Sequence, residues 1–315
     1  MSLLRTSLAV GALLALTAAC GASDATSRAE GMPETLVLAA IPAENSTDLK
    51  AGYEPLIKLL EKETGATVEF KQASDYAGVV EGMIAGNVDI AFFGPFAYVI
   101  ATTNGAKIQP LGAVTAAKGQ PAGYHSYGLT QGSNTAINDL KDFAGKSVCF
   151  VDPGSTSGFL YPSAGLISAG VIKSSVEADL TAGLKPVYAG GHDASALAIK
   201  NGDCEAGFAM ESMVDKTLPE KGELKAGDLK QVWKSETIAG SLFAARTDLG
   251  PAALATLTQV MTKKANADHL LSQRLCEGEC LITDEDAWGV VPAADADYDG
   301  VREVCAVTKS DKCKG

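Results

Sequence analysis

Basic residues are scarce in this sequence relative to acidic ones. The 315 residues include 26 Lys and Arg against 38 Asp and Glu, which gives a net charge of −12. A nucleic-acid surface needs a positive patch that neutralises phosphates, so this balance argues against nucleic acid as a partner. Any anion must instead be held by local donors such as backbone amides and hydroxyls.

The N-terminal apolar segment lacks the length to cross a bilayer. It runs only from Leu8 to Leu16, follows Arg5 and precedes the small residues 17–19. This pattern is typical of a secretory signal over residues 1–19 and not of a membrane-spanning helix. We therefore expect an exported protein.

Cys20 directly follows the small residues, as does the lipidated cysteine of a bacterial lipobox, although Thr17 stands where that motif usually has Leu. We expect a lipoprotein of the cell membrane that faces the extracellular or periplasmic side, with plain secretion as the alternative. Residues 20–33 are small and polar, which predicts a flexible tether.

The spaced Cys-x-x-Cys pairs of a zinc site are absent, and no histidine lies near the C-terminal cysteines. The even number of remaining cysteines in an exported chain predicts disulfides instead. Cys276 could close locally on Cys280 and Cys305 on Cys313, which would leave Cys149 with Cys204, although six cysteines allow fifteen connectivities. The candidates are Cys149, Cys204, Cys276, Cys280, Cys305 and Cys313.

The only calcium-like pattern is incomplete. Asp295, Asp297, Asp299 and Gly300 imitate the start of an EF-hand loop, but Ala306 stands where the twelfth-position Glu is required. We expect no metal and no other cofactor. The chain also lacks the Gly-x-Ser-x-Gly elbow of a secreted hydrolase, so we expect no enzyme and keep a hydrolase only as a weaker alternative.

Strand-like and helix-like segments alternate along the chain, which predicts an α/β fold with mainly parallel sheets flanked by helices. Two such units joined by two extended crossings predict two lobes and a hinge, with residues 34–125 and 237–315 in lobe I and 126–236 in lobe II. Expected helices include 76–85, 137–143, 193–201 and 251–271, and expected strands include 34–41, 67–71, 87–93, 147–151, 185–188, 205–210 and the extended runs 124–130 and 238–246.

The stretch Val148 to Leu160 predicts a strand, a loop and a helix N-terminus. Ser155, Thr156 and Ser157 fall where the first helical N–H groups have no intrahelical acceptor, so amides and hydroxyls point to one small volume. The helix dipole favours an oxyanion there. The alternative is an ordinary helix cap.

Polar residues follow other expected strands as well, and ligands of open α/β sheets bind beyond the C-terminal strand ends. For three of these residues there is also a purely structural interpretation. Tyr98 could only pack at a helix start, and His192 with Asp193 could only cap a helix. Tyr124 and Tyr127 fit a core better than a cleft. The candidates at strand ends are Glu44, Asn45, Tyr98, His192, Asp193 and Glu211.

In order and spacing, several short motifs resemble the substrate-binding components of phosphate, phosphite and phosphonate ABC importers. The resemblance covers 34–302 and includes Pro42-Ala43-Glu44-Asn45, Tyr53-Glu54-Pro55-Leu56, Phe93-Gly94-Pro95-Phe96-Ala97-Tyr98, Ser155-Thr156-Ser157-Gly158, Gly191-His192-Asp193 and Ala296-Asp297-Tyr298.

The resemblance implies a type II periplasmic-binding-protein fold whose two lobes close over a phosphorus oxyanion, and an ABC permease with its ATPase as partners. Tyr98 would donate its phenol, while Ser155, Thr156 and Ser157 hold the oxygens. His192 would donate to an oxygen or carry a positive charge. Asp193 or Glu211 would accept from a protonated oxygen or pair with the ammonium of an aminoalkylphosphonate.

The function this implies is the capture of phosphate, phosphite or a phosphonate by a monomer, for delivery to the permease. A sensor that presents its closed lobes to a membrane receptor is the alternative. The choice among the anions depends on what their fourth substituent meets, which distances in the fold decide.

Overall fold

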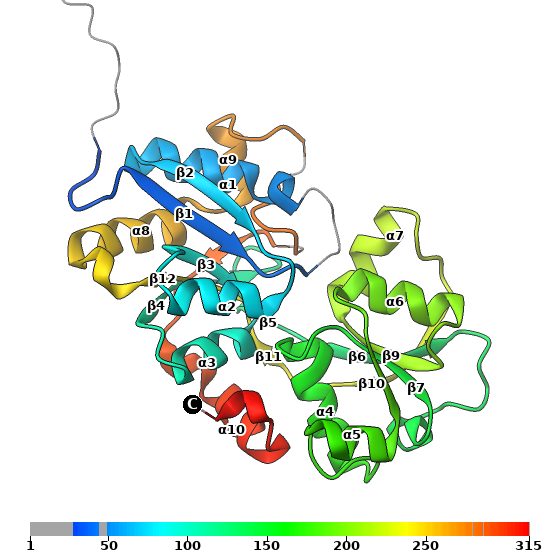
Figure 1. The fold of residues 1–315 in the computed structure, drawn as a ribbon. Helices are drawn as coiled ribbons and strands as arrows, with labels where there is room; N and C mark the ends of the chain where they lie inside the picture. The colour runs from blue at the N-terminus through cyan, green and yellow to red at the C-terminus, as the bar shows by residue number, and fades with distance from the viewer. Residues whose placement is uncertain (1–27, 44–48, 279, 286, 315) are drawn as a thin grey trace, which may run out of the picture.

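The computed structural model describes residues 28–43, 49–278, 280–285 and 287–314. The expected signal segment, Cys20, Glu44 and Asn45 lie outside the described residues. Among the described residues, no helix is both long and apolar enough to cross a membrane. Figure 1 shows two lobes, each built on its own sheet with helices on both faces.

The lobe I sheet has the strand order β2-β1-β3-β12-β4-β13. Strands β1 to β3 pair in parallel, whereas β12 runs antiparallel to β3 and β4. In Figure 1, α1, α8 and α9 lie on one side of the sheet, and α2 and α3 lie on the other. The strands are Thr35–Ala40 (β1), Thr67–Gln72 (β2), Ile90–Phe93 (β3), Ile108–Thr115 (β4), Leu242–Arg246 (β12) and Gly289–Val291 (β13); the helices are Leu49–Thr64 (α1), Tyr76–Ile84 (α2), Pro95–Thr103 (α3), Thr247–Leu249 (η4), Pro251–Lys264 (α8), Ala267–Ser272 (α9) and Asp295–Tyr298 (η5).

The lobe II sheet repeats the same arrangement in the order β8-β7-β9-β6-β10. Strand β7 is parallel to β8 and β9, and β6 is antiparallel to β9 and β10. The strands are Ser126–Gln131 (β6), Ser147–Phe150 (β7), Lys185–Tyr188 (β8), Ala206–Met210 (β9) and Leu229–Lys234 (β10); the helices are Leu140–Phe143 (η1), Thr156–Leu160 (η2), Tyr161–Ser168 (α4), Glu177–Gly183 (α5), His192–Asn201 (α6), Met213–Thr217 (η3) and Leu218–Glu220 (α7).

The two lobes are joined by a short antiparallel ribbon. Strand β5 (Gly123–Tyr124) pairs with β11 (Ile238–Ala239), where the chain enters and leaves lobe II. The predicted α/β fold of two lobes with two crossing strands is confirmed at this level.

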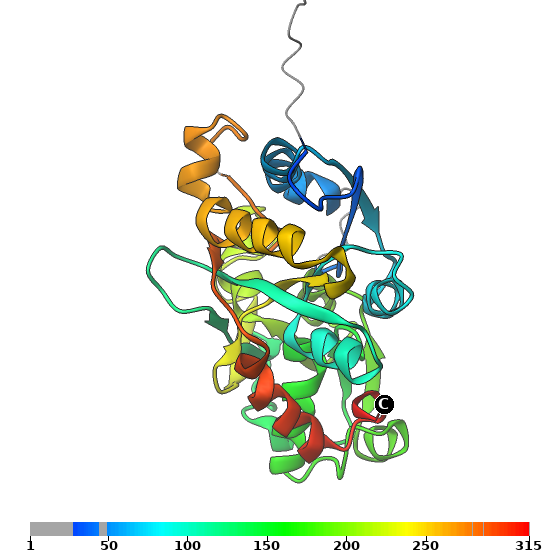
Figure 2. The same ribbon diagram turned by 90° about the vertical axis from the view of Figure 1, so that its left-hand side faces the viewer.

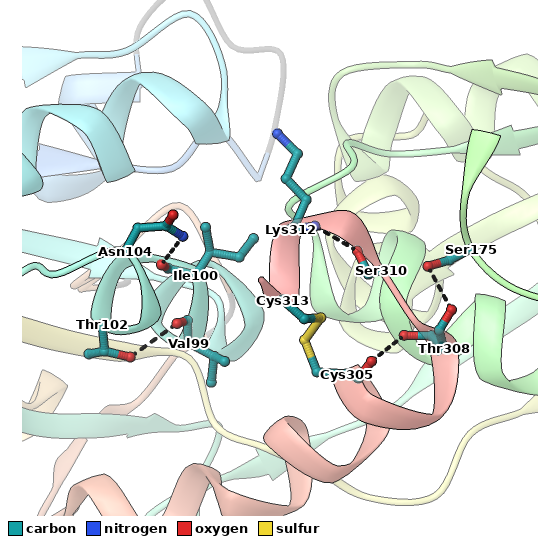
Figure 3. Close-up of a disulfide and its surroundings, with 10 residues drawn as sticks. All are labelled: Val99, Ile100, Thr102, Asn104, Ser175, Cys305, Thr308, Ser310, Lys312 and Cys313. Carbon is teal, nitrogen blue, oxygen red and sulfur yellow. Dashed lines mark hydrogen bonds between the residues drawn. A yellow bond between two sulfur atoms is a disulfide. The ribbon is translucent and has the colours of Figure 1, made fainter. Parts of the chain in front are cut away.

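The C-terminal segment contacts both lobes. Helix α10 (Asp299–Thr308) packs near α3, and the carbonyl of Thr308 accepts from the N–H (2.9 Å) and hydroxyl (3.2 Å) of Ser175 in lobe II. Figure 3 shows the disulfide between Cys305 and Cys313 between α3 and the Ser175 segment, where it ties η6 (Asp311–Cys313) back to α10. Figure 2 shows this red helix beside the green part of lobe II.

The structure joins the two cysteine pairs that local closure favours and the pair that this leaves. Cys149 on β7 is bonded to Cys204 after α6, and Cys276 is bonded to Cys280. The first bond links β7 to the segment that leads into β9, the central strand of the lobe II sheet. The disulfides therefore fix one position inside lobe II and two positions in the C-terminal part of the chain.

Several expected elements differ in the structure. The helix expected over 251–271 is divided because Asn266 is extended (φ −151°) and caps α9 by accepting from the N–H of His269. The segment 137–143 forms only the short 3₁₀ turn η1, and the extended run 238–246 divides into β11 and β12 in different sheets. Strands β4, β10 and β13 were not expected.

Candidate functional site

The hydroxyl loop connects β7 to a helix that begins with a π turn. The side chain of Ser155 accepts from the N–H of Gly158 at 3.0 Å, which caps this turn. The turn is the π helix η2, followed directly by α4, where the sequence predicted an ordinary helix. π turns are rare and frequently occur at functional sites, because they widen the backbone locally.

Two backbone amides of this turn donate no hydrogen bond to any other described residue. They belong to Thr156 and Ser157, which are each 1% exposed. Buried amides are nearly always hydrogen-bonded, so two adjacent exceptions at a helix start need an explanation. Amides at a helix N-terminus with this arrangement are suited to hold an anion.

Both lobes contribute to the same region because two hydrogen bonds cross between them. The N–H of Phe96, at the start of α3, donates to the Thr156 hydroxyl at 2.9 Å. The N–H of His192 donates to the carbonyl of Ala43 at 2.9 Å. The hydroxyl loop therefore faces the C-terminal strand ends of lobe I in a closed arrangement of the lobes.

Two tyrosines that the sequence did not single out for the cleft surround the hydroxyl loop. Tyr76, at the start of α2, lies near the Ser155 side chain, and Tyr124 lies near the side chains of Thr156 and Ser157, close enough for these hydroxyls to influence the pKa of each phenol. Burial raises the pKa of both phenols, and nearby carboxylates add to this. Both phenols therefore stay protonated and can donate.

His192 begins α6 and is almost fully buried. Its Nδ1 accepts from the N–H of Met210 at 3.0 Å, and burial lowers its pKa to about 3. The imidazole is therefore neutral, with its proton on Nε2. Of the two predicted roles for His192, donation of one hydrogen bond fits this geometry and the charged form does not.

Tyr98 does not join this group. Its hydroxyl donates to Asp295 Oδ1 at 2.6 Å, and its ring packs against Tyr298 with the centroids 5.1 Å apart. Burial raises its pKa, and the bond to the Asp295 carboxylate adds to this. The expected ligand-binding role of Tyr98 stays a prediction, and the geometry favours Tyr76 and Tyr124 in its place.

The acidic candidates lie at the edge of the group. Asp193 is in the first turn of α6. Glu211 follows β9, and its Oε2 accepts from Lys234 Nζ at 3.0 Å and from the Tyr127 hydroxyl at 3.5 Å. Asn45 is outside the described residues, so its role also stays a prediction.

A small cavity lies between the hinge and both lobes, and Tyr124, which also lies near Thr156 and Ser157, forms part of its lining. It measures about 70 Å³ and includes Glu285, which the sequence did not single out. Nothing in the acidic loop around Glu285 predicts burial, and only the fold brings it to Ser241. The cavity is lined by Val114, Ala116, Gly123, Tyr124, Met210, Glu211, Ser212, Gly240, Ser241 and Glu285.

The described residues offer no group of three or more His, Cys, Asp or Glu side chains able to hold a metal ion. The donors of the site are backbone amides, hydroxyls, phenols and one neutral imidazole. Such neutral donors suit a small oxyanion.

Comparison with known proteins assigns the family. Residues 38–298 match the family described as ABC transporter, phosphonate, periplasmic substrate-binding protein. The chain belongs to this family. It is 65% identical over 303 residues to the phosphate-import protein PhnD of Mycolicibacterium smegmatis, covering 95% of this chain and 94% of that protein. It is 32% identical over 225 residues to the phosphonates-binding periplasmic protein of Escherichia coli, covering 70% and 63%.

Solved structures confirm the fold. The binding component of an ABC phosphonate transporter from Pseudomonas aeruginosa has a TM-score of 0.72 and 24% identity, covering 88% of this chain and 87% of that one. PhnD1 of Prochlorococcus marinus, in complex with methylphosphonate, has a TM-score of 0.71 and 20% identity, covering 89% and 100%. Members of this family are substrate-binding components of ABC transporters, and this protein is one of them.

Proposed function

We propose that this protein captures a phosphorus oxyanion between its lobes and delivers it to an ABC permease, with inorganic phosphate as the first candidate. The observation that carries the proposal is the pair of buried amides of Thr156 and Ser157, which have no acceptor among the described residues. The M. smegmatis relative, named as a phosphate-import protein, supports phosphate over its phosphonate and phosphite analogues.

The anion would be held by neutral donors. The amides of Thr156 and Ser157 and the hydroxyls of Ser155 and Ser157 approach from lobe II, while the phenols of Tyr76 and Tyr124 approach from lobe I and the hinge. Bonds from both lobes would stabilise the closed arrangement when the anion is bound. The lobes would comprise 34–125 with 237–315, and 126–236.

The remaining partners follow from this role. The protein would act as a monomer, without catalysis, and would meet the permease and its ATPase at the membrane. A lipid on Cys20 would keep it there, on the extracellular or periplasmic side. The closed lobes would form the surface that the permease recognises.

Calorimetry tests the proposal. The exported chain, unfolded and refolded with its disulfides intact to strip carried-over ligand, is titrated with phosphate, phosphite, methylphosphonate, 2-aminoethylphosphonate and sulfate. We expect phosphate to bind most tightly. A flat titration with every phosphorus anion on folded protein would contradict the proposal.

A matched pair of variants tests the site. Ser157→Ala removes a donor to a charged oxygen and should weaken phosphate binding by about 1–3 kcal/mol. Ser272→Ala, on the exposed side of α9, removes a hydroxyl that bonds only the carbonyl of His269 and should leave binding unchanged. Equal affinities of the two variants would place the anion elsewhere.

An aminoalkylphosphonate is the second candidate ligand. Glu211 and Glu285 line the same cavity as Tyr124, where an ammonium group could reach both carboxyl groups. Tighter binding of 2-aminoethylphosphonate than of phosphate in the same titration would favour this candidate.

A further inference from the structure

Glu285 occupies a wall of the cavity at the point where three parts of the molecule meet. It comes from the loop before β13 in lobe I, while Tyr124 comes from the hinge and Glu211 from lobe II. Its side chain is about nine-tenths buried, with 9% of the residue exposed. A carboxyl group in such a position normally has several hydrogen-bond donors or a cation.

The loop that carries Glu285 is firmly held. The Thr283 hydroxyl accepts from the N–H of Glu285 at 3.1 Å and donates to its carbonyl at 3.0 Å. The neighbouring Asp284 accepts from the Tyr53 hydroxyl at 2.6 Å and from the N–H of Ala43 at 3.2 Å. The backbone therefore fixes where the Glu285 carboxyl points.

The carboxyl itself is only partly satisfied. Ser241 Oγ donates to Glu285 Oε1 at 3.2 Å, and among the described residues this is its one hydrogen-bond partner. The described residues that line the cavity include no Lys or Arg. The second carboxyl oxygen is thus available to a ligand atom in the cavity.

We propose that Glu285 shares one proton with the nearest oxygen of the bound anion, so that binding depends on the number of protons that this pair carries. This inference rests on the proposed function. A protonated carboxyl facing a phosphate dianion and a carboxylate facing a phosphate monoanion contain the same number of protons, so both describe one hydrogen-bonded pair. Removing the shared proton leaves a carboxylate against a phosphate dianion, so two negative charges oppose each other, and adding a proton places two protons against each other.

The surroundings of Glu285 set which form exists before binding. Burial, and then the charge of Asp284, raise its pKa from 4.5 to about 8, while the Ser241 hydroxyl lowers it. The other ionisable groups that face it are Tyr53, Tyr76 and Tyr124 together with Glu211, whose carboxylate is bonded to Lys234. At neutral pH Glu285 is therefore protonated and can donate.

Above its pKa, Glu285 becomes an anion that faces another anion. Phosphate keeps one proton throughout this range, so the loss of affinity comes from the protein. Binding must then take up one proton, and the association constant should fall about tenfold for each pH unit.

The experiment measures phosphate binding by calorimetry from pH 7.5 to 9.5, in two buffers with different heats of ionisation. For the unaltered protein we expect a fall of about tenfold per unit above pH 8 and uptake of about one proton at pH 9.5. Glu285→Gln keeps the size and one donor without the charge, so its affinity should stay flat and its proton uptake should be absent.

Two further variants keep the test decisive. Glu54→Gln makes the same change on the exposed face of α1 and should keep the unaltered profile. Ser241→Ala removes the bond that lowers the pKa of Glu285, so the fall in affinity should move to higher pH. If Glu285→Gln does not fold, the Ser241→Ala profile decides.

The outcomes separate the two proposals. A Glu285→Gln profile that falls like the unaltered one, or an unshifted Ser241→Ala profile where the first variant does not fold, overturns the role of Glu285. Phosphate binding that is equally tight at pH 7.5 and 9.5 overturns it as well and leaves the proposed function intact. An absence of phosphate binding at every pH overturns both.

Discussion

Lobe I contains two buried carboxyl groups in very different surroundings. Asp89, before β3, accepts from Arg246 Nε and from the N–H of Val37, both at 2.7 Å. Glu285 has a single hydroxyl partner, Ser241, among the described residues. The first carboxyl is matched by a cation and an amide, whereas the second faces the cavity without a cation.

The same contrast separates the sheet from the hydroxyl loop. The amides of the sheet are paired along its strands, while those of Thr156 and Ser157 have no acceptor among the described residues. Matched groups hold the fold together, and unmatched groups mark where a ligand completes the structure. Substitutions at the matched groups should therefore change stability, and those at the unmatched groups should change binding.

The largest effect is expected at Asp89. Asp89→Ala leaves the Arg246 guanidinium and the Val37 amide without their acceptor and should lower the free energy of unfolding by about 3–5 kcal/mol. Urea denaturation checks the value, and phosphate affinity of the folded protein should not change. Asp248→Ala removes an exposed carboxylate 3.4 Å from the same arginine and should cost far less. Equal losses in the free energy of unfolding for the two variants would show that burial does not strengthen the interaction of Asp89 with Arg246.

Glu285→Gln should change stability in a pH-dependent way. The pKa of Glu285 is about 8 in the folded protein against an ordinary 4.5, so between these values the folded state binds more protons than the unfolded state. The free energy of unfolding of the unaltered protein should therefore fall as pH rises from about 5 to 8. The variant should lack this loss of a few kcal/mol, since one pKa unit corresponds to about 1.4 kcal/mol.

Urea denaturation of both proteins at pH 5, 6.5 and 8 measures this difference. The variant should gain stability relative to the unaltered protein at each step, while Glu54→Gln should show no such trend. A constant difference over this range would mean that Glu285 is already ionised at pH 5.

The sequence predicts the hydrogen-bonded framework of this molecule better than it predicts the polar groups that lack partners. Strand and helix periodicity predicts most of the strands and helices of the two sheets, because apolar patterning and core formation are the same physical constraint. The hydroxyl loop is also evident, since Ser155, Thr156 and Ser157 combine capping chemistry with a strand end. Local closure favours the observed partners of Cys276 and Cys305.

What could not be predicted depends on long-range packing. Tyr76 begins an apolar helix and reads as a core residue, and only the approach of lobe II brings Ser155 to its phenol. Glu285 stands in an acidic loop that reads as solvent-exposed, and its burial requires β12 to place Ser241 beside it. The break at Asn266 did leave a local signal, because Asn is a favoured helix cap.

The smallest effect separates two tyrosines that the sequence and the geometry rank differently. Tyr124→Phe removes a phenol next to Thr156 and Ser157 and should weaken phosphate binding by about 1–2 kcal/mol, with little effect on stability. Tyr98→Phe removes the bond to Asp295 and should lower stability by about 1 kcal/mol without changing affinity. Calorimetry and urea denaturation of both variants give the two quantities. A loss of affinity in Tyr98→Phe that equals or exceeds that in Tyr124→Phe would restore the sequence-based assignment, because the phenol of Tyr98 would then have to leave Asp295 to reach the anion.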